Sequence, residues 1–215
     1  MNELLYLRCT QKGFRPRHVC EIGVYLPETS NVLGFIRDGV RATLIEPMPD
    51  MVGRLRAFFA GHDKVTILPV AVYTHDGTID LCRAGASTFA KELPASPALR
   101  NDRFDVSAAE TVAVPARRFD SLDDGTIDLL SIDTEGCEWY ALQYMNSRPR
   151  VISLETGFRR YRNPFLREIL GWMDANGYDV WYFDRSDTVF IRRGMHPLTL
   201  RERLARRLSW MLNGR

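Results

Sequence analysis

The feature that most constrains this chain is the alternation of two hydrophobic patterns along its length. Short apolar runs rich in β-branched residues recur, and stretches with helical spacing separate several of them. The strand-like runs are residues 18–23, 42–46, 65–72, 127–133, 151–155, 178–183 and 188–191, and the helix-like stretches are 28–37, 50–59, 137–144 and 164–175. Near-continuous apolar strands that alternate with helices are typical of parallel sheets covered on both faces. The pattern therefore predicts a doubly wound, Rossmann-like α/β sheet.

Two departures from simple alternation refine this prediction. Only the segment from Asp184 to Asp187 separates the last two strand-like runs, which is short enough for a hairpin and too short for a crossover. We therefore expect seven strands, mostly parallel, with an antiparallel last strand. A longer segment before the fourth run contains a turn at 75–77 and further strand-like runs at 78–81 and 110–114.

Charge is unevenly distributed along the chain. Of the formal net charge of +2, residues 192–215 carry seven arginines and one glutamate, which gives +6 there and leaves −4 for the rest. Leucines from Leu198 onward recur at helical spacing, with arginines on the other face. This predicts a basic amphipathic C-terminal helix over 194–215, appended to a domain over 1–193. We expect the helix to dock on its own domain or on a second copy of the chain, as in a homo-oligomer. Peripheral contact with an anionic membrane is the alternative.

Other features favour a cytoplasmic protein without a nucleic-acid partner. No apolar run approaches the roughly 20 residues that a membrane-spanning helix needs, and the first 17 residues show no secretory-signal pattern. The four cysteines have no zinc or iron–sulfur spacing, which favours reduced thiols. No motif that reads nucleic acid accompanies the basic tail. The inner face of a membrane, reached through the basic helix, is the alternative location.

A glycine turn and an acidic residue indicate a candidate nucleoside site. The first strand-like run ends at Gly23, and Glu46 ends the second run, 23 residues further on. Ligands of open α/β sheets bind beyond the carboxyl ends of the strands, and an acid at this spacing accepts hydrogen bonds from ribose hydroxyls. A complete glycine-rich G-x-G-x-x-G sequence is missing. A simple turn and a surface glutamate are therefore the alternative.

Carboxylates also gather at the ends of two later runs. Asp133 and Glu135 end the run that begins at Ile127, two residues apart and thus on one side of an extended chain, and Glu155 ends the next run. Acids brought together in this way need cations, shared protons or a metal ion to compensate them. The three are therefore candidate catalytic residues. For Asp133 the alternative is helix capping, which is the role that we assign to Glu138.

These motifs occur in the order and spacing of a known family. The matching blocks are residues 21–30, 45–49, 65–80, 114–120, 127–138 and 152–155, of which 127–138 is the most specific: Ile127-Asp128-Leu129-Leu130-x-Ile132-Asp133-x-Glu135-Gly136-x-Glu138. Over roughly residues 17–157 the chain resembles the FkbM family, a group of S-adenosylmethionine-dependent O-methyltransferases with the class I methyltransferase fold. The resemblance implies S-adenosyl-L-methionine as methyl donor and a sheet whose last strand is antiparallel.

Carried over by position, the resemblance also implies a set of cofactor-binding residues. It implies that Glu21, Gly23 and Tyr25 line the methionine end of the cofactor and that Glu46, followed by Pro47, accepts the ribose hydroxyls. Ala71 and Val72 would flank the adenine, and Ser87 would lie in a loop near cofactor or substrate. The chain departs from the family at Pro27, where a second glycine is usual. Proline removes a backbone N–H that would otherwise be available to the cofactor carboxylate. As an alternative, Pro27 is simply the first residue of the next helix.

The resemblance implies that the acceptor is a hydroxyl, either on a sugar of a glycan or glycolipid or on a small-molecule secondary metabolite. In-line methyl transfer requires the oxygen to be held about 3 Å from the methyl carbon, and a group that accepts its proton. We expect Asp133 to be this base, supported by Glu135 and Glu155. A divalent metal held by the same acids is the alternative, and no metal is predicted. The rival functions are a nicotinamide-dependent oxidoreductase and a non-catalytic binding protein that keeps the fold.

Overall fold

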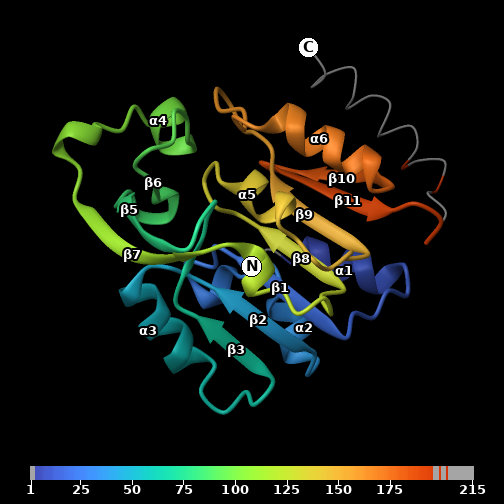
Figure 1. Ribbon diagram of the computed structural model, residues 1–215. Helices are drawn as coiled ribbons and strands as arrows, with labels where there is room; N and C mark the ends of the chain where they lie inside the picture. The colour runs from blue at the N-terminus through green and yellow to red at the C-terminus, as the bar shows by residue number, and fades with distance from the viewer. Residues whose placement is uncertain (1–2, 196–198, 200–201, 203–215) are drawn as a thin grey trace.

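The computed structural model describes residues 3–195 together with residues 199 and 202. Its centre is a seven-stranded sheet with the order β10-β11-β9-β8-β1-β2-β3 (Figure 1). In chain order the strands are β1 (His18–Ile22), β2 (Arg41–Ile45), β3 (Val65–Leu68), β8 (Leu129–Ile132), β9 (Val151–Glu155), β10 (Tyr178–Asp184) and β11 (Asp187–Arg192). Neighbouring strands from β3 to β9 are parallel, whereas β11 is antiparallel to both β9 and β10. The predicted sheet, including its antiparallel last strand, is confirmed.

Helices cover both faces of this sheet. The helices are α1 (Leu4–Gln11), α2 (Leu33–Arg37), α3 (Pro49–Phe58), α4 (Pro97–Asn101), α5 (Glu138–Gln143) and α6 (Leu166–Ala175). Leu5 of α1 and Phe35 of α2 belong to the same apolar cluster as Val19 of β1. The next residue of β1, Cys20, belongs instead to the cluster that contains Leu142 of α5. Successive side chains of a strand point to opposite faces, so the sheet is doubly wound, as predicted.

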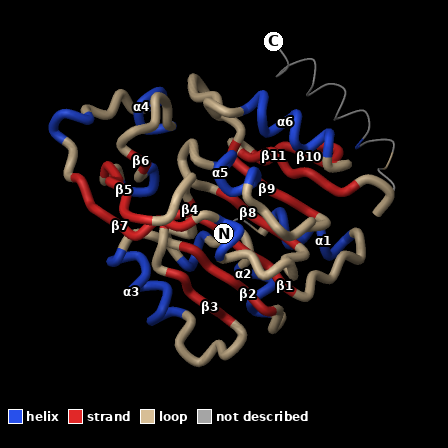
Figure 2. Tube along the Cα trace, in the orientation of Figure 1, coloured by secondary structure: helices blue, strands red, loops and turns tan. Residues whose placement is uncertain are grey.

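A second, smaller sheet shares no strand with the first, and its strands β5, β6 and β7 lie at one side of it in Figure 2. Its strands are β4 (Ala71–Val72), β5 (Gly77–Cys82), β6 (Phe89–Ala90) and β7 (Thr111–Arg117), in the order β4-β7-β5-β6. The predicted runs at 78–81 and 110–114 fall in β5 and β7, which pair with each other as antiparallel strands. The sequence did not indicate that these runs form a sheet of their own.

Two predicted elements are each divided in the structure. The run at 65–72 forms two strands in different sheets, because Pro69, which has no N–H for a ladder, follows β3. The stretch at 28–37 forms a 3₁₀ turn, Pro27–Thr29, and the separate helix α2. Between them, Ser30 and Asn31 leave the helical path, and both donate hydrogen bonds to the carboxylate of Glu21. The other 3₁₀ turns are Gly85–Ser87, Val106–Ala108 and Phe119–Ser121.

The predicted C-terminal helix falls almost wholly outside the described residues. Glu202 is described, and it accepts hydrogen bonds from the Trp181 indole at 2.6 Å and from Lys12 at 3.1 Å. Among the helices that the structure describes, none has the length and apolar character needed to span a bilayer.

Candidate active site

A cavity of about 700 Å³ lies at the carboxyl ends of β1, β2 and β8, where the second sheet forms one wall. Nine of the predicted site residues line it: Glu21, Gly23, Tyr25, Glu46, Pro47, Ala71, Val72, Asp133 and Glu135. Ser87 and Glu155 do not line it. Ser87 lies in a loop whose neighbours Gly85 and Thr88 reach the cavity, and Glu155 is buried at the end of β9. Apolar side chains of β5 and β6, including Leu81 and Phe89, face it from the second sheet.

The turn after β1 is tightly constrained. Gly23 has a φ of +81°, and its N–H donates to the carbonyl of Ile45 at 2.9 Å. A Cβ atom added to Gly23 would lie 1.8 Å from the carbonyl oxygen of Asp133, so no other residue fits without movement of the backbone. Pro27 begins the 3₁₀ turn Pro27–Thr29. The interpretation of Pro27 as a first helical residue, where no helical hydrogen bond needs its N–H, is therefore confirmed.

Glu46 follows β2 and is buried at the cavity wall. Its Oε2 accepts a hydrogen bond from the Tyr25 N–H and its Oε1 one from the Met48 N–H, each at 2.9 Å. Burial raises the pKa of Glu46, and these backbone donors oppose the shift. An ionised carboxylate offers about four lone-pair sites, so about two remain for further donors. The alternative of a surface glutamate is therefore wrong, and lone pairs remain on the carboxylate for further donors such as ribose hydroxyls.

Glu21 lies in β1, lines the cavity and is only 2 % exposed. Ser30 donates from its hydroxyl to Oε2, and the N–H of Asn31 donates to Oε1 at 2.9 Å. Burial raises the pKa of Glu21 to about 7, although both donors oppose the shift. The carboxylate therefore fixes the loop between β1 and α2, which carries Tyr25.

Asp133 occupies the end of β8 and faces the cavity. Its carboxylate has no hydrogen-bond donor among the residues that the structure describes, whereas its backbone N–H donates to Ile22 at 2.9 Å. Burial, and then the negative charges of Asp187 and Glu138, raise the pKa of Asp133 well above its usual range. Burial and Asp133 itself raise the pKa of Glu135, and the nearby Ser87 hydroxyl partly offsets that shift.

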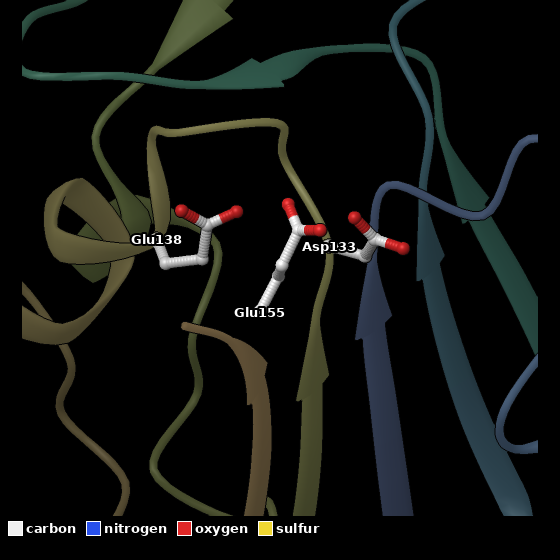
Figure 3. A group of neighbouring side chains, drawn as sticks. All are labelled: Asp133, Glu138 and Glu155. Atoms are coloured by element: carbon white, nitrogen blue, oxygen red, sulfur yellow. The ribbon is translucent and has the colours of Figure 1, made fainter. Parts of the chain in front are cut away.

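Asp133, Glu138 and Glu155 form a compact group, which we call the acid cluster (Figure 3). One carboxylate oxygen from each lies within 4.8 Å of the others. In Figure 3 the carboxylate of Glu155 lies between those of Glu138 and Asp133. Burial raises the pKa of Glu155, and the negative charges of Asp133 and Glu135 raise it further. The structure thus brings together two of the three predicted catalytic acids and adds Glu138.

Glu138 is fully buried and held by several donors. Its Oε1 accepts hydrogen bonds from the Thr134 N–H at 2.9 Å, the Thr134 hydroxyl at 3.1 Å and the Gly136 N–H at 3.3 Å. Its Oε2 accepts one from the Asn163 amide. The carboxylate therefore binds the turn before α5, as the capping role requires. The alternative of Asp133 as the N-cap is wrong, because α5 begins at Glu138 and Cys137 precedes it.

Sequence reasoning missed Asp187, the first residue of β11. It is buried, lines the cavity and accepts hydrogen bonds from Ser186 at 3.1 Å and Ser153 at 3.3 Å. Its place at the carboxyl edge of the parallel strands follows only once β11 is known to lie antiparallel next to β9. The sequence pattern indicates only a turn at 184–187.

The fold and the cavity define a doubly wound α/β domain with a cavity at the carboxyl ends of its strands, and the family follows from a direct match. Residues 21–180 match the family described as Methyltransferase FkbM domain. The chain belongs to this family, whose class is that of S-adenosylmethionine-dependent methyltransferases. The resemblance stated from the motifs is confirmed. No curated protein matches the chain in sequence.

Solved structures show the same fold at low sequence identity. Methyltransferase FkbM from Methylobacillus flagellatus KT is 15 % identical, with a TM-score of 0.52 over 82 % of this chain. The chain spans only 44 % of that protein. A candidate caffeoyl-CoA O-methyltransferase from Staphylococcus aureus is 12 % identical, with a TM-score of 0.50 over 88 % of this chain and 81 % of that one. These likenesses support the class I methyltransferase fold.

Proposed function

We propose that this chain transfers a methyl group from S-adenosyl-L-methionine to a hydroxyl group. The acceptor would be a sugar hydroxyl of a glycan or glycolipid, or a hydroxyl of a secondary metabolite. The observation that carries the proposal is the position of Asp133, whose carboxylate faces the cavity at the end of β8 without a protein donor among the described residues. Family membership supplies the class of reaction.

The residues around the cavity fit this cofactor. Glu46 retains about two lone-pair sites for the ribose hydroxyls. Ala71 and Val72 provide an apolar surface for the adenine, and the turn at Gly23 and Tyr25 would border the methionine end. Because Ser30 and Asn31 already occupy the Glu21 carboxylate, we assign Glu21 to holding the loop that forms this end of the site.

The bound cofactor would supply an electrophilic methyl group on a sulfonium. The protein has to hold the acceptor oxygen in line, about 3 Å from the methyl carbon, and to accept the hydroxyl proton. Asp133 is our candidate for the proton acceptor. Because burial raises its pKa, Asp133 needs a nearby positive charge to stay ionised, and the sulfonium of the bound cofactor would supply one. Glu135 and Glu155, whose pKa values burial also raises, would support it as neighbouring carboxyl groups that share protons with it.

The two rival functions make different binding predictions. A nicotinamide-dependent oxidoreductase would use the same glycine turn and Glu46, but the glycine-rich sequence is incomplete and the family match is to methyltransferases. A non-catalytic protein would have lost the cofactor site. Pro27 no longer favours it, since this proline begins a 3₁₀ turn.

Calorimetric titration of the purified chain tests the proposal. We expect S-adenosylmethionine to bind with micromolar affinity and NAD not to bind. Transfer from radiolabelled S-adenosylmethionine to a panel of glycosides should then require a free hydroxyl and fail with the matching permethylated glycosides. Binding of NAD, or no binding of S-adenosylmethionine with or without the panel present, would overturn the proposed function.

A further inference from the structure

The acid cluster lies where the ends of β8 and β9 meet the start of α5. Asp133 borders the cavity, whereas Glu138 and Glu155 are buried behind it. None of the ion pairs formed by the described residues includes these three acids, so no arginine or lysine compensates them there. Buried carboxylates this close together need shared protons or a cation.

Donors are distributed unequally over the acid cluster. Glu138 accepts four hydrogen bonds, which fix its orientation. Glu155 is 6 % exposed, and its Oε2 is buried without a partner among the described residues. Figure 3 shows this carboxylate directed into the space between Glu138 and Asp133. Two of the three carboxylates thus keep lone pairs that protein donors do not use, and one lone pair remains on the second oxygen of Glu138.

The buried hydroxyl of Tyr161 independently indicates that the acid cluster binds a ligand. Tyr161 is fully buried, and its hydroxyl also has no partner among the described residues. The hydroxyl lies 3.5 Å from the position of a Cβ on Gly136, in the turn that leads to Glu138. Gly136 itself donates to the Glu138 carboxylate, so the phenol lies against the turn that holds one member of the cluster. Buried polar groups normally have partners, and an ion with its bound water would provide one for this hydroxyl.

We propose that Asp133, Glu138 and Glu155 together bind one divalent cation of the hard, oxygen-preferring kind, Mg²⁺ or Mn²⁺. Three carboxylates and no imidazole or thiolate in the ligand set match this preference. The cation takes one oxygen from each acid, and water completes its shell toward Tyr161 and the cavity. Asp133 keeps its second oxygen for the acceptor. The cation also orients the acceptor hydroxyl and lowers the pKa of that hydroxyl. This last role rests on the proposed methyl transfer.

Manganese binding by the full chain tests the site without any assay of activity. The protein is stripped with EDTA, desalted and titrated with Mn²⁺, and free Mn²⁺ is followed by electron paramagnetic resonance. We expect one Mn²⁺ per chain, displaced by excess Mg²⁺. Loss of an outer-shell partner alone weakens a metal site about 10- to 100-fold. Glu155→Gln should therefore weaken binding by more than about 100-fold, while Glu168→Gln, an exposed change on α6, should leave it unchanged.

Two results would overturn the site: no Mn²⁺ bound at millimolar concentration, or equal binding by Glu155→Gln. Circular dichroism checks that each variant is folded. Should Glu155→Gln not fold, Asp133→Asn replaces it, because Asp133 is only half-buried beside the cavity. Titration with S-adenosylmethionine in EDTA separates the two proposals. Cofactor binding without Mn²⁺ binding would overturn only the proposed metal site. Mn²⁺ binding without methyl transfer would overturn only the proposed function.

Discussion

Gly23 lies directly against the main-chain carbonyl of Asp133, so the turn after β1 and the candidate base share a backbone contact. The Asp133 N–H also donates to Ile22, the residue before Gly23. Two strands that are more than 100 positions apart in the chain are thereby locked together at the cavity. Any change that widens this contact moves the candidate base relative to the cofactor site.

Gly23→Ala should therefore be among the most damaging single changes. We expect a loss of at least about 4 kcal/mol in the free energy of unfolding, because the new Cβ cannot coexist with the Asp133 carbonyl. Gly125→Ala is the matched control. Gly125 has nearly the same φ, +80°, but a Cβ there would meet nothing within 4 Å, so only about 1–2 kcal/mol of backbone strain is expected. Equal losses in urea denaturation would contradict the contact.

Glu46→Ala should weaken binding of S-adenosylmethionine by about 1–3 kcal/mol through loss of charge-assisted hydrogen bonds to the ribose. The change also frees the N–H groups of Tyr25 and Met48. Calorimetry measures the affinity, and thermal unfolding monitors the loop. The control is Glu28→Gln, an exposed change in the 3₁₀ turn Pro27–Thr29. An unaltered dissociation constant would remove Glu46 from the cofactor site.

Asp133→Asn should leave cofactor affinity nearly unchanged while slowing methyl transfer by about 10²- to 10⁴-fold, since the amide cannot accept the hydroxyl proton. The measurement is single-turnover transfer to whichever panel acceptor is methylated. Full activity of this variant would assign the proton to another group, and Glu135→Gln would be the next change to make.

Glu21 should make stability depend on pH. Its pKa is about 7 in the folded protein against 4.5 as the ordinary value. Between these values the folded state binds more protons than the unfolded state, so the free energy of unfolding falls as pH rises. The contribution amounts to about 3 kcal/mol. Relative to wild type, Glu21→Gln should lose this part of the slope in urea denaturation between about pH 4.5 and pH 7. An identical slope in both proteins would contradict the burial of an ionisable group at Glu21.

The sequence predicted the strands that lie in the main sheet because their apolar runs are nearly continuous. It failed at residues 65–72, where Pro69 divides an apolar run between two sheets. Pairing within the second sheet depends on contacts between distant residues, which periodicity does not contain. The sequence therefore predicted strand segments within β5 and β7 but not that these two strands pair with each other.

The candidate site was predictable where it depended on strand ends alone. Gly23, Glu46 and Asp133 all meet at one cavity because parallel strands bring their carboxyl ends to the same edge. Asp187 was missed because its place depends on the insertion of β11 between β9 and β10. The place of Glu138 in the acid cluster depends on where α5 begins, which capping signals alone did not locate.

The strands of the second sheet pair only with one another, although they form a wall of the cavity. Their residues, 71–117, form a single insertion between β3 and β8. The register of the seven-stranded sheet, which positions Gly23 and Asp133, does not depend on how this insertion pairs. On the proposed function, a contiguous cassette over residues 77–117 can therefore be exchanged to alter one wall of the cavity, whereas Ala71 and Val72 have to stay because they form the proposed adenine surface.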